Sequence, residues 1–281
     1  MKRPEIGAMC QISEGMGEGS SIDKVAAFGL HCAQAVSWDM NLATLEVARA
    51  LKRRAADAGV RLTAIWGGYS GPKAWNFTRG PVTLGFTPPE YREVRIRDMK
   101  RWAEFAAEAG APAVITHCGF LPENMTDPAF EPVAVAINEV ASYCRSLGLG
   151  FWFETGQETP VVLLRFFQEI GLDNLGINLD PANLLLYGKG NPIDALYVFG
   201  KYVRAIHAKD GMPPTNGREL GHEVKVGEGF VRYPQFIPAL IECGFEGDLT
   251  IEREISGEEQ DRDIRDTVVY LSGLLDKCCG K

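Results

Sequence analysis

Eight short apolar segments, rich in Val, Ile and aromatic residues, alternate along the chain with eight longer amphipathic segments. We expect strands at residues 6–12, 31–38, 61–66, 113–117, 150–154, 176–180, 203–209 and 248–252. We expect helices at residues 21–28, 41–58, 90–109, 132–147, 161–170, 192–199, 233–243 and 263–275. This alternation is typical of a parallel sheet, because each helix returns the chain to the end at which the next strand begins.

Two folds are built from such alternation, a doubly wound open sheet and a closed barrel. A dinucleotide-binding open sheet carries Gly-x-Gly-x-x-Gly directly after its first strand. Residues 15–19 read Gly-Met-Gly-Glu-Gly, so the third glycine falls one position early, and no Gly-Lys-Ser/Thr phosphate loop occurs. The 281 residues suit a barrel, which needs about 250. We therefore expect residues 1–281 to form a single-domain α/β protein, a (β/α)8 TIM barrel.

Charge and cysteine content exclude several function classes. The 37 acidic residues outnumber the 29 basic ones, whereas a nucleic-acid binder usually carries a basic patch. No apolar run is long enough to span a membrane, and the amino terminus lacks the apolar core of a signal peptide. The seven cysteines form no Cys-x-x-Cys pair and fit free thiols in a reducing compartment. We expect a cytoplasmic protein that binds neither nucleic acid nor membranes.

The last four expected strands each close on an ionisable residue of a metal-binding type: Glu154, Asp180, His207 and Glu252. In a TIM barrel these strand ends meet at the face that carries the active site. Three carboxylates brought together there would repel one another, and a divalent cation removes that conflict. Mixed oxygen and nitrogen ligands favour one divalent ion, with Mn²⁺ as first choice and Mg²⁺, Co²⁺ or Zn²⁺ as alternatives.

Each of these residues also has an ordinary structural explanation. Asp180 precedes Pro181 and would serve as a helix cap, and a lone histidine at a strand end is often a hydrogen-bonded structural residue. Their common position at four successive strand ends favours a metal site over four separate structural roles.

Short motifs surround these residues: Asp180 followed by Pro-Ala-Asn, Ile-His-Ala-Lys-Asp at 206–210, Gly-Glu-Gly at 227–229 and Ile-Glu-Arg-Glu at 251–254. In this order, and together with Glu154, they resemble the xylose isomerase-like TIM-barrel superfamily over nearly the whole chain. That group includes sugar phosphate isomerases/epimerases, ketose 3-epimerases and endonuclease IV. The resemblance implies that Glu154, Asp180, His207 and Glu252 are the metal ligands. As in the ketose 3-epimerases, it also implies that Glu154 and Glu252 are the catalytic acid/base pair.

The resemblance implies a metal-dependent sugar isomerase or epimerase that transfers a proton through an enediolate stabilised by the metal. A metal-dependent sugar lyase or dehydratase acting on a keto-sugar is the alternative, and product mass separates the two. A non-catalytic carbohydrate-binding barrel is less favoured because all four ligands are present. An endonuclease IV-like nuclease needs more histidines than the four of this chain, and Asn183 stands where the family often has another.

The expected partner is a small-molecule sugar or polyol. Lys209 shares a strand face with His207, and His117 ends a strand that points the same way. The expected substrate-binding residues are His117, Asn183, Lys209, Gln157, Glu228, Trp66 and Arg218. The long connections at 67–89 and 211–230 are suited to lids over a site or to contacts in a homo-oligomer, and the sequence does not choose between these.

Overall fold

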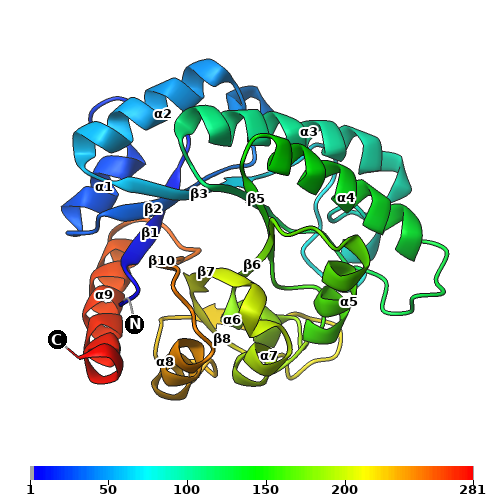
Figure 1. Ribbon diagram of the computed structural model, residues 1–281. Helices are drawn as coiled ribbons and strands as arrows, with labels where there is room; N and C mark the ends of the chain where they lie inside the picture. The colour runs from blue at the N-terminus through cyan, green and yellow to red at the C-terminus, as the bar shows by residue number, and fades with distance from the viewer. Residues whose placement is uncertain (1–2, 281) are drawn as a thin grey trace.

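Eight parallel strands close into a barrel in the computed structural model, which describes residues 3–280 (Figure 1). The barrel strands are β1 (Ile6–Gln11), β2 (Cys32–Ser37), β3 (Arg61–Gly67), β4 (Ala113–Thr116), β5 (Gly150–Glu154), β6 (Leu175–Leu179), β7 (Val203–Ala208) and β10 (Leu249–Ile251). Around the ring they follow chain order, and β10 pairs with both β7 and β1. The expected TIM-barrel fold is confirmed.

Helices surround the barrel (Figure 1). They are α1 (Ser21–Ala27), α2 (Leu45–Ala58), α3 (Pro89–Ala109), α4 (Phe130–Ser146), α5 (Pro160–Ile170), α6 (Pro181–Leu186), α7 (Pro192–Phe199), α8 (Tyr233–Glu242) and α9 (Glu258–Cys279). The helix expected at 41–58 begins only at Leu45. The Thr44 side chain caps it by accepting a hydrogen bond from the Val47 amide at 3.3 Å, and residues Met40–Leu42 form a separate 3-10 turn.

Two elements depart from strict alternation. Helix α6 follows β6 directly, so two helices separate β6 from β7. The connection after β7 is not a plain loop, because β8 (Asp210–Met212) and β9 (His222–Val224) pair there as a small antiparallel sheet. The Asp210 carboxylate accepts hydrogen bonds from the amides of Gly227, Gly229 and Val231, which folds the end of this connection back over the barrel.

The barrel interior is divided between an apolar and a polar part. Val36, Ala64, Trp66, Ala113 and Ile115 form a buried apolar cluster on the side of β2, β3 and β4. A set of buried polar side chains, with Gln34 from β2, comes mainly from the strands β5, β6, β7 and β10: Gln34, Glu154, Asn178, His207 and Thr250. Because buried polar groups need partners, the second set marks where a functional site is held.

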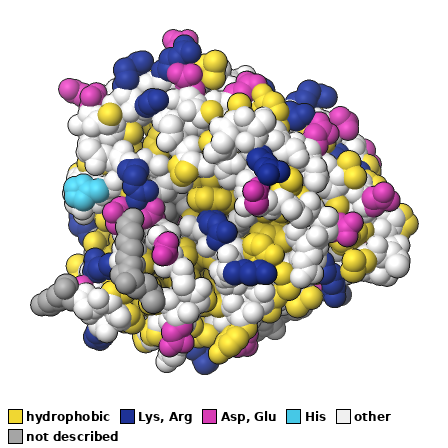
Figure 2. Space-filling view, in the orientation of Figure 1, with side chains coloured by type: hydrophobic (Ala, Val, Ile, Leu, Met, Phe, Trp, Pro, Cys, Tyr) yellow, Lys and Arg dark blue, Asp and Glu magenta, His cyan; other side chains and the backbone are white. Residues whose placement is uncertain are grey.

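The first described residue, Arg3, lies beside α9, where its guanidinium pairs with Asp276 at 2.9 Å. On the face in Figure 2, Lys and Arg side chains are interspersed with Asp and Glu. Ion pairs of the surface include Arg61 with Asp248 and Arg145 with Asp173. Within residues 3–280, every helix is either too short or too polar to cross a membrane.

Candidate metal centre

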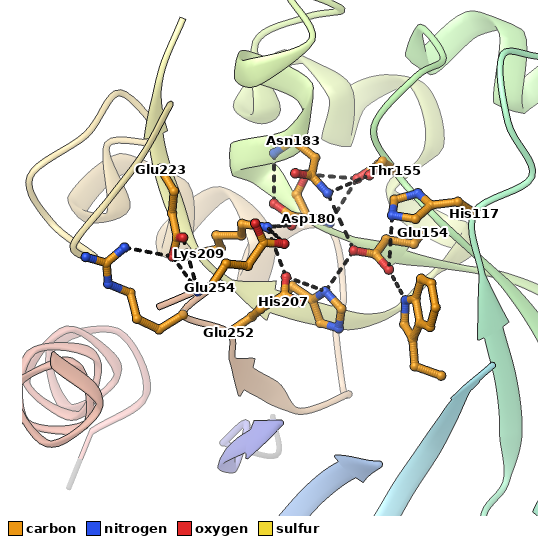
Figure 3. A network of polar contacts seen from close by, with 12 residues as sticks. His117, Glu154, Thr155, Asp180, Asn183, His207, Lys209, Glu223, Glu252 and Glu254 are labelled. Atoms are coloured by element: carbon orange, nitrogen blue, oxygen red, sulfur yellow. Dashed lines mark hydrogen bonds and ion pairs between the residues drawn. The ribbon is translucent and has the colours of Figure 1, made fainter. Parts of the chain in front are cut away.

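The four side chains expected to bind a metal converge at the carboxyl ends of β5, β6, β7 and β10 (Figure 3). They are Glu154, Asp180, His207 and Glu252, and one ligand atom from each lies within 4.8 Å of the others. Strand register brings them together: Glu154 pairs with Asn178, and His207 pairs with Thr250. Asp180 and Glu252 lie two residues beyond these partners, so strand alternation directs them to the same side.

Asp180 has one carboxylate oxygen in use and one to spare. Its Oδ1 accepts the Asn183 amide hydrogen at 2.9 Å and so caps α6. Its Oδ2 is buried and accepts no hydrogen bond. The backbone is fixed by Thr155, whose hydroxyl donates to the Asp180 carbonyl at 2.8 Å and accepts from the Asp180 amide at 2.9 Å. Asp180 therefore caps helix α6 through Oδ1 and also offers Oδ2 as a candidate metal ligand.

His207 lies between two carboxylates and has its ring orientation fixed from behind. Its Nδ1 lies 3.0 Å from Glu154 Oε1 and 3.2 Å from Glu252 Oε2, and its Nε2 lies 2.7 Å from Gln34 Oε1. Gln34 donates its own amide hydrogen to Asn178 at 3.1 Å, so its oxygen is left to accept from His207 Nε2. Nδ1 is therefore the ring nitrogen that faces the ligand cluster.

Lys209 is a buried cation beside the cluster (Figure 3). Its ammonium lies 3.3 Å from Glu252, 3.6 Å from Asp180 Oδ2 and 2.7 Å from Glu254. Burial disfavours the charged lysine, but Glu252 and Asp180 outweigh burial and raise the pKa of Lys209 well above its usual value. Lys209 thus carries a permanent positive charge at the site.

The carboxyl groups of the cluster differ in protonation. Burial raises the pKa of Asp180 to about 8, and Lys209 only partly offsets this effect. Burial also opposes ionisation of Glu252, but Lys209 and His207 prevail and hold its pKa far below the usual range. Burial likewise opposes ionisation of Glu154, but His117 and His207 lower its pKa. Glu154 and Glu252 are therefore ionised at neutral pH, whereas Asp180 retains its proton.

Glu154 is also held by groups on the other side of the barrel. Its Oε2 accepts a hydrogen bond from the Trp66 indole and lies 3.6 Å from His117 Nε2, and the Asn183 amide lies 3.5 Å from its Oε1. Burial lowers the pKa of His117, which favours the neutral imidazole there. This carboxylate is fixed at the boundary between the ligand cluster and the space above it.

A cavity of about 330 Å³ opens above the cluster, which is within the size range of small-ligand sites. It is lined by Met9, Val36, Trp38, Trp66, Trp75, His117, Glu154, Gln157, Asn183, Leu186, Tyr187, Leu220, Glu252 and Glu254. Trp38 packs against Trp66 and Trp75 at centroid distances of 4.7 and 5.7 Å. One wall is therefore aromatic and the facing wall polar, as a ligand with both C–H faces and hydroxyl groups requires.

The structure places the expected substrate-binding residues in two groups. His117, Asn183, Gln157 and Trp66 line the cavity, and Lys209 lies beside the ligand cluster, 3.6 Å from Asp180 Oδ2. Glu228 and Arg218 do not line it: both are exposed in the connection after β7. The amides on either side of Glu228 bind Asp210, which holds the loop backbone inward and leaves this side chain in solvent.

Four further residues at the site were missed by the sequence analysis: Gln34, Trp38, Tyr187 and Glu254. Gln34 had a signal, since it is a long polar residue in the middle of the apolar segment Cys-Ala-Gln-Ala-Val. Trp38, Tyr187 and Glu254 lie in loops or at a helix end, where the periodicity of apolar residues does not predict which way a side chain points.

The fold and this geometry define a class: a TIM barrel with a buried carboxylate–imidazole cluster at the carboxyl ends of its strands. Comparison with known families agrees, because residues 22–272 match the model of the xylose isomerase-like TIM barrel. A xylose isomerase domain protein from Planctomyces limnophilus is 33% identical, with a TM-score of 0.92 over 100% of both chains. The chain belongs to the xylose isomerase-like TIM barrel family.

More distant structures share the fold. A xylose isomerase-like TIM barrel protein from Mycobacterium smegmatis, solved in complex with magnesium, is 19% identical over 92% of this chain and 88% of that one, with a TM-score of 0.68. A D-psicose 3-epimerase solved in the presence of D-fructose is 16% identical over 99% and 100%, with a TM-score of 0.71. An uncharacterised protein of Methanocaldococcus jannaschii is 25% identical over 176 residues. That match spans 58% of this chain and 58% of that curated relative.

Proposed function

We propose that the protein is a divalent-metal-dependent isomerase or epimerase of sugars. The observation that carries the proposal is the convergence of three carboxylates and one imidazole within 4.8 Å beneath a sugar-sized cavity. The magnesium complex and the D-psicose 3-epimerase of the same fold support this choice.

The donor set fits a divalent cation. Asp180 Oδ2 is a buried acceptor that receives no hydrogen bond, and His207 Nδ1 faces the cluster. Glu154, Asp180, His207 and Glu252 would hold the ion, with Mn²⁺ as first choice and Mg²⁺, Co²⁺ or Zn²⁺ as alternatives. A bound divalent ion would stabilise negative charge that develops on a substrate oxygen during proton removal.

Glu154 and Glu252 are the groups that would move the proton. The hydrogen next to a sugar carbonyl is weakly acidic, and its removal leaves an enediolate. Both carboxylates line the cavity and are ionised, which is the form of a carboxyl group that accepts a proton from the sugar carbon. They stand three strands apart around the ring, with β6 and β7 between them, which suits proton removal on one face of the sugar and return on the other.

Trp66 and His117 position Glu154, while Lys209 and His207 position Glu252. Lys209 is engaged by carboxylates, so little free positive charge is left for a phosphate group. We therefore infer an uncharged sugar or polyol as the substrate.

The test follows hydrogen exchange at carbon. Protein stripped with chelator is reloaded with Mn²⁺, Mg²⁺, Co²⁺ or Zn²⁺ and incubated with ketoses in D₂O, and deuterium at carbon is followed by NMR and mass spectrometry. Glu154→Gln and Glu252→Gln should keep the fold and lose exchange, whereas Glu131→Gln on the exposed face of α4 should behave as wild type. Exchange in the Glu154/Glu252 double variant, absence of metal uptake, or a product lighter by one water would each contradict the proposal.

A further inference from the structure

A second chamber adjoins the cavity above the candidate metal centre. It measures about 470 Å³ and lies between the carboxyl ends of β1 and β10 and the helices α1 and α9. It is lined by Met9, Gln11, Ser21, Lys24, Val25, Phe28, Val36, Trp38, Ile251, Glu252, Arg253, Glu254, Ile255, Gln260 and Ile264. Five of these, Met9, Val36, Trp38, Glu252 and Glu254, also line the first cavity. The two spaces are therefore adjacent and share a wall.

The shared wall contains the residues best placed to contact a ligand that crosses it. Trp38 is 37% exposed although its ring packs on Trp66, so part of the indole is open to the site. Glu252 belongs to the metal-ligand cluster and lines both spaces. Because Trp38 and Glu252 border both spaces, a ligand bound in the first cavity at the metal centre would enter the second chamber by extending past Trp38.

The lining of the second chamber indicates an uncharged ligand with both apolar and hydroxyl-bearing faces. Phe28, Trp38 and Ile264 supply apolar surface, and Gln11 and Gln260 supply amide groups. The two cations of the chamber are already paired. Lys24 binds Asp261, while Arg253 binds Glu223 at 3.1 Å and Asp263 at 2.9 Å. A phosphate or carboxylate would have to break these pairs, whereas a neutral sugar ring would not.

We propose that the substrate is a glycoside: a keto-sugar placed at the metal centre, with a second sugar ring in the chamber between α1 and α9. This inference rests on the proposed function and extends it to the substrate class. The first cavity, at about 330 Å³, accommodates one ring, and the second chamber provides the space for the other.

Turnover of free and glycosylated ketoses tests this directly. D-Fructose is compared with turanose, maltulose, leucrose and isomaltulose, which carry glucose on O3, O4, O5 or O6 of fructose. We expect at least one of the four to be preferred over fructose by about tenfold or more in kcat/KM for exchange of carbon-bound hydrogen. A preference for fructose over all four would overturn the proposal while leaving the proposed function intact.

A variant at Gln11 makes the test specific to the second chamber. Gln11 is exposed at the end of β1, and strand alternation directs its side chain to the same side as Met9. Gln11→Trp should fill the chamber and lower the ratio of disaccharide to fructose kcat/KM by about tenfold. Gln168→Trp, the same change at an exposed position of α5, should leave that ratio unaltered. A ratio that is equal in wild type and Gln11→Trp would contradict the assignment.

A binding measurement tests the glycoside substrate separately from the isomerase or epimerase activity. Quenching of tryptophan fluorescence measures the affinity of the metal-loaded protein for the same sugars without any reaction. Tighter binding of a disaccharide than of fructose supports the second ring even if no exchange occurs, a result that would reject only the isomerase or epimerase. Equal affinity for all five sugars overturns the glycoside proposal whatever the exchange assay shows.

Discussion

Glu158 provides a quantitative test of how the burial of a carboxyl group changes the pH dependence of the stability of this protein. It lies in the connection between β5 and α5, is 2% exposed, and neither of its carboxyl oxygens accepts a hydrogen bond of normal geometry. Burial raises its pKa to about 8, and nearby backbone amides and Lys189 offset this effect only in part. We expect Glu158→Gln to stabilise the protein at alkaline pH.

The magnitude and the sign follow from linkage. Below pH 4.5, Glu158 is protonated in both the folded and the unfolded chain, so its ionisation does not affect the free energy of unfolding. Between pH 4.5 and about 8 the unfolded chain loses this proton while the folded chain keeps it, so rising pH lowers the free energy of unfolding. One pKa unit corresponds to about 1.4 kcal/mol, which gives a total of about 5 kcal/mol. Glutamine does not ionise, so this loss is absent in the variant.

Urea unfolding at pH 5, 7 and 9, with chelator present, measures the effect. The difference between Glu158→Gln and wild type should be below about 1 kcal/mol at pH 5 and rise to several kcal/mol in favour of the variant at pH 9. Taking the difference cancels the titration of distant groups. Glu169→Gln, at an exposed position of α5, should show no such trend. A Glu158→Gln difference that is constant or decreases with pH would refute the reasoning.

Three further predictions concern the metal centre. Gln34→Leu removes the acceptor that orients His207 and should weaken metal binding by about 10–100-fold in titration calorimetry; unchanged affinity would show that the ring needs no such support. Metal at 100 times its dissociation constant should stabilise the fold by about 2.7 kcal/mol, or roughly 5–10 °C in Tm by scanning calorimetry, and Asp180→Ala should abolish the shift. Metal uptake at pH 7 should release about two protons, one from Asp180 and one from His207, and the affinity for metal should rise with pH. Calorimetric titrations in two buffers of different ionisation enthalpy measure the number of protons released, and a binding enthalpy that is the same in both buffers would contradict this prediction.

The barrel was predictable because its determinants are local and repeated. Each apolar segment is long enough to form one strand of the barrel wall, and the amphipathic segment that follows packs its apolar face against the outside of that wall. The pair β8 and β9 lacked such a signal, since each has three residues and its connection is held by Asp210, whose partners lie 17 to 21 positions away in sequence. Helix α6 has six residues, which is too short for helical periodicity to identify.

The candidate site was predictable only as far as strand ends reveal direction. A residue at the carboxyl end of a barrel strand faces one end of the barrel whatever the loops do, so Glu154 and His207 could be placed from sequence. Arg218 and Glu228 could not, because their direction depends on how the connection after β7 folds, and Asp210 holds that connection through partners 17 to 21 positions away. Gln34 reaches His207 across 173 positions of sequence, and only the closed ring of strands brings such residues together.

Charge balance explains why this cluster contains a lysine among the candidate metal ligands. Without a metal, ionised Glu154 and Glu252 face protonated His207 and Lys209, and Asp180 keeps its proton, so the charges of these five groups sum to zero. Glu254, which also pairs with Lys209, is left out of this sum because its side chain is 61% exposed to solvent. If a divalent cation replaced the protons of Asp180 and His207, three carboxylates would face Lys209 and the ion, and the sum would again be zero. Burying a net charge in a protein interior is costly, so we expect a site that is neutral in both states to fold without the ion and to take it up in exchange for two protons. Lys209 makes this exchange possible because its pKa is too high for it to release a proton itself.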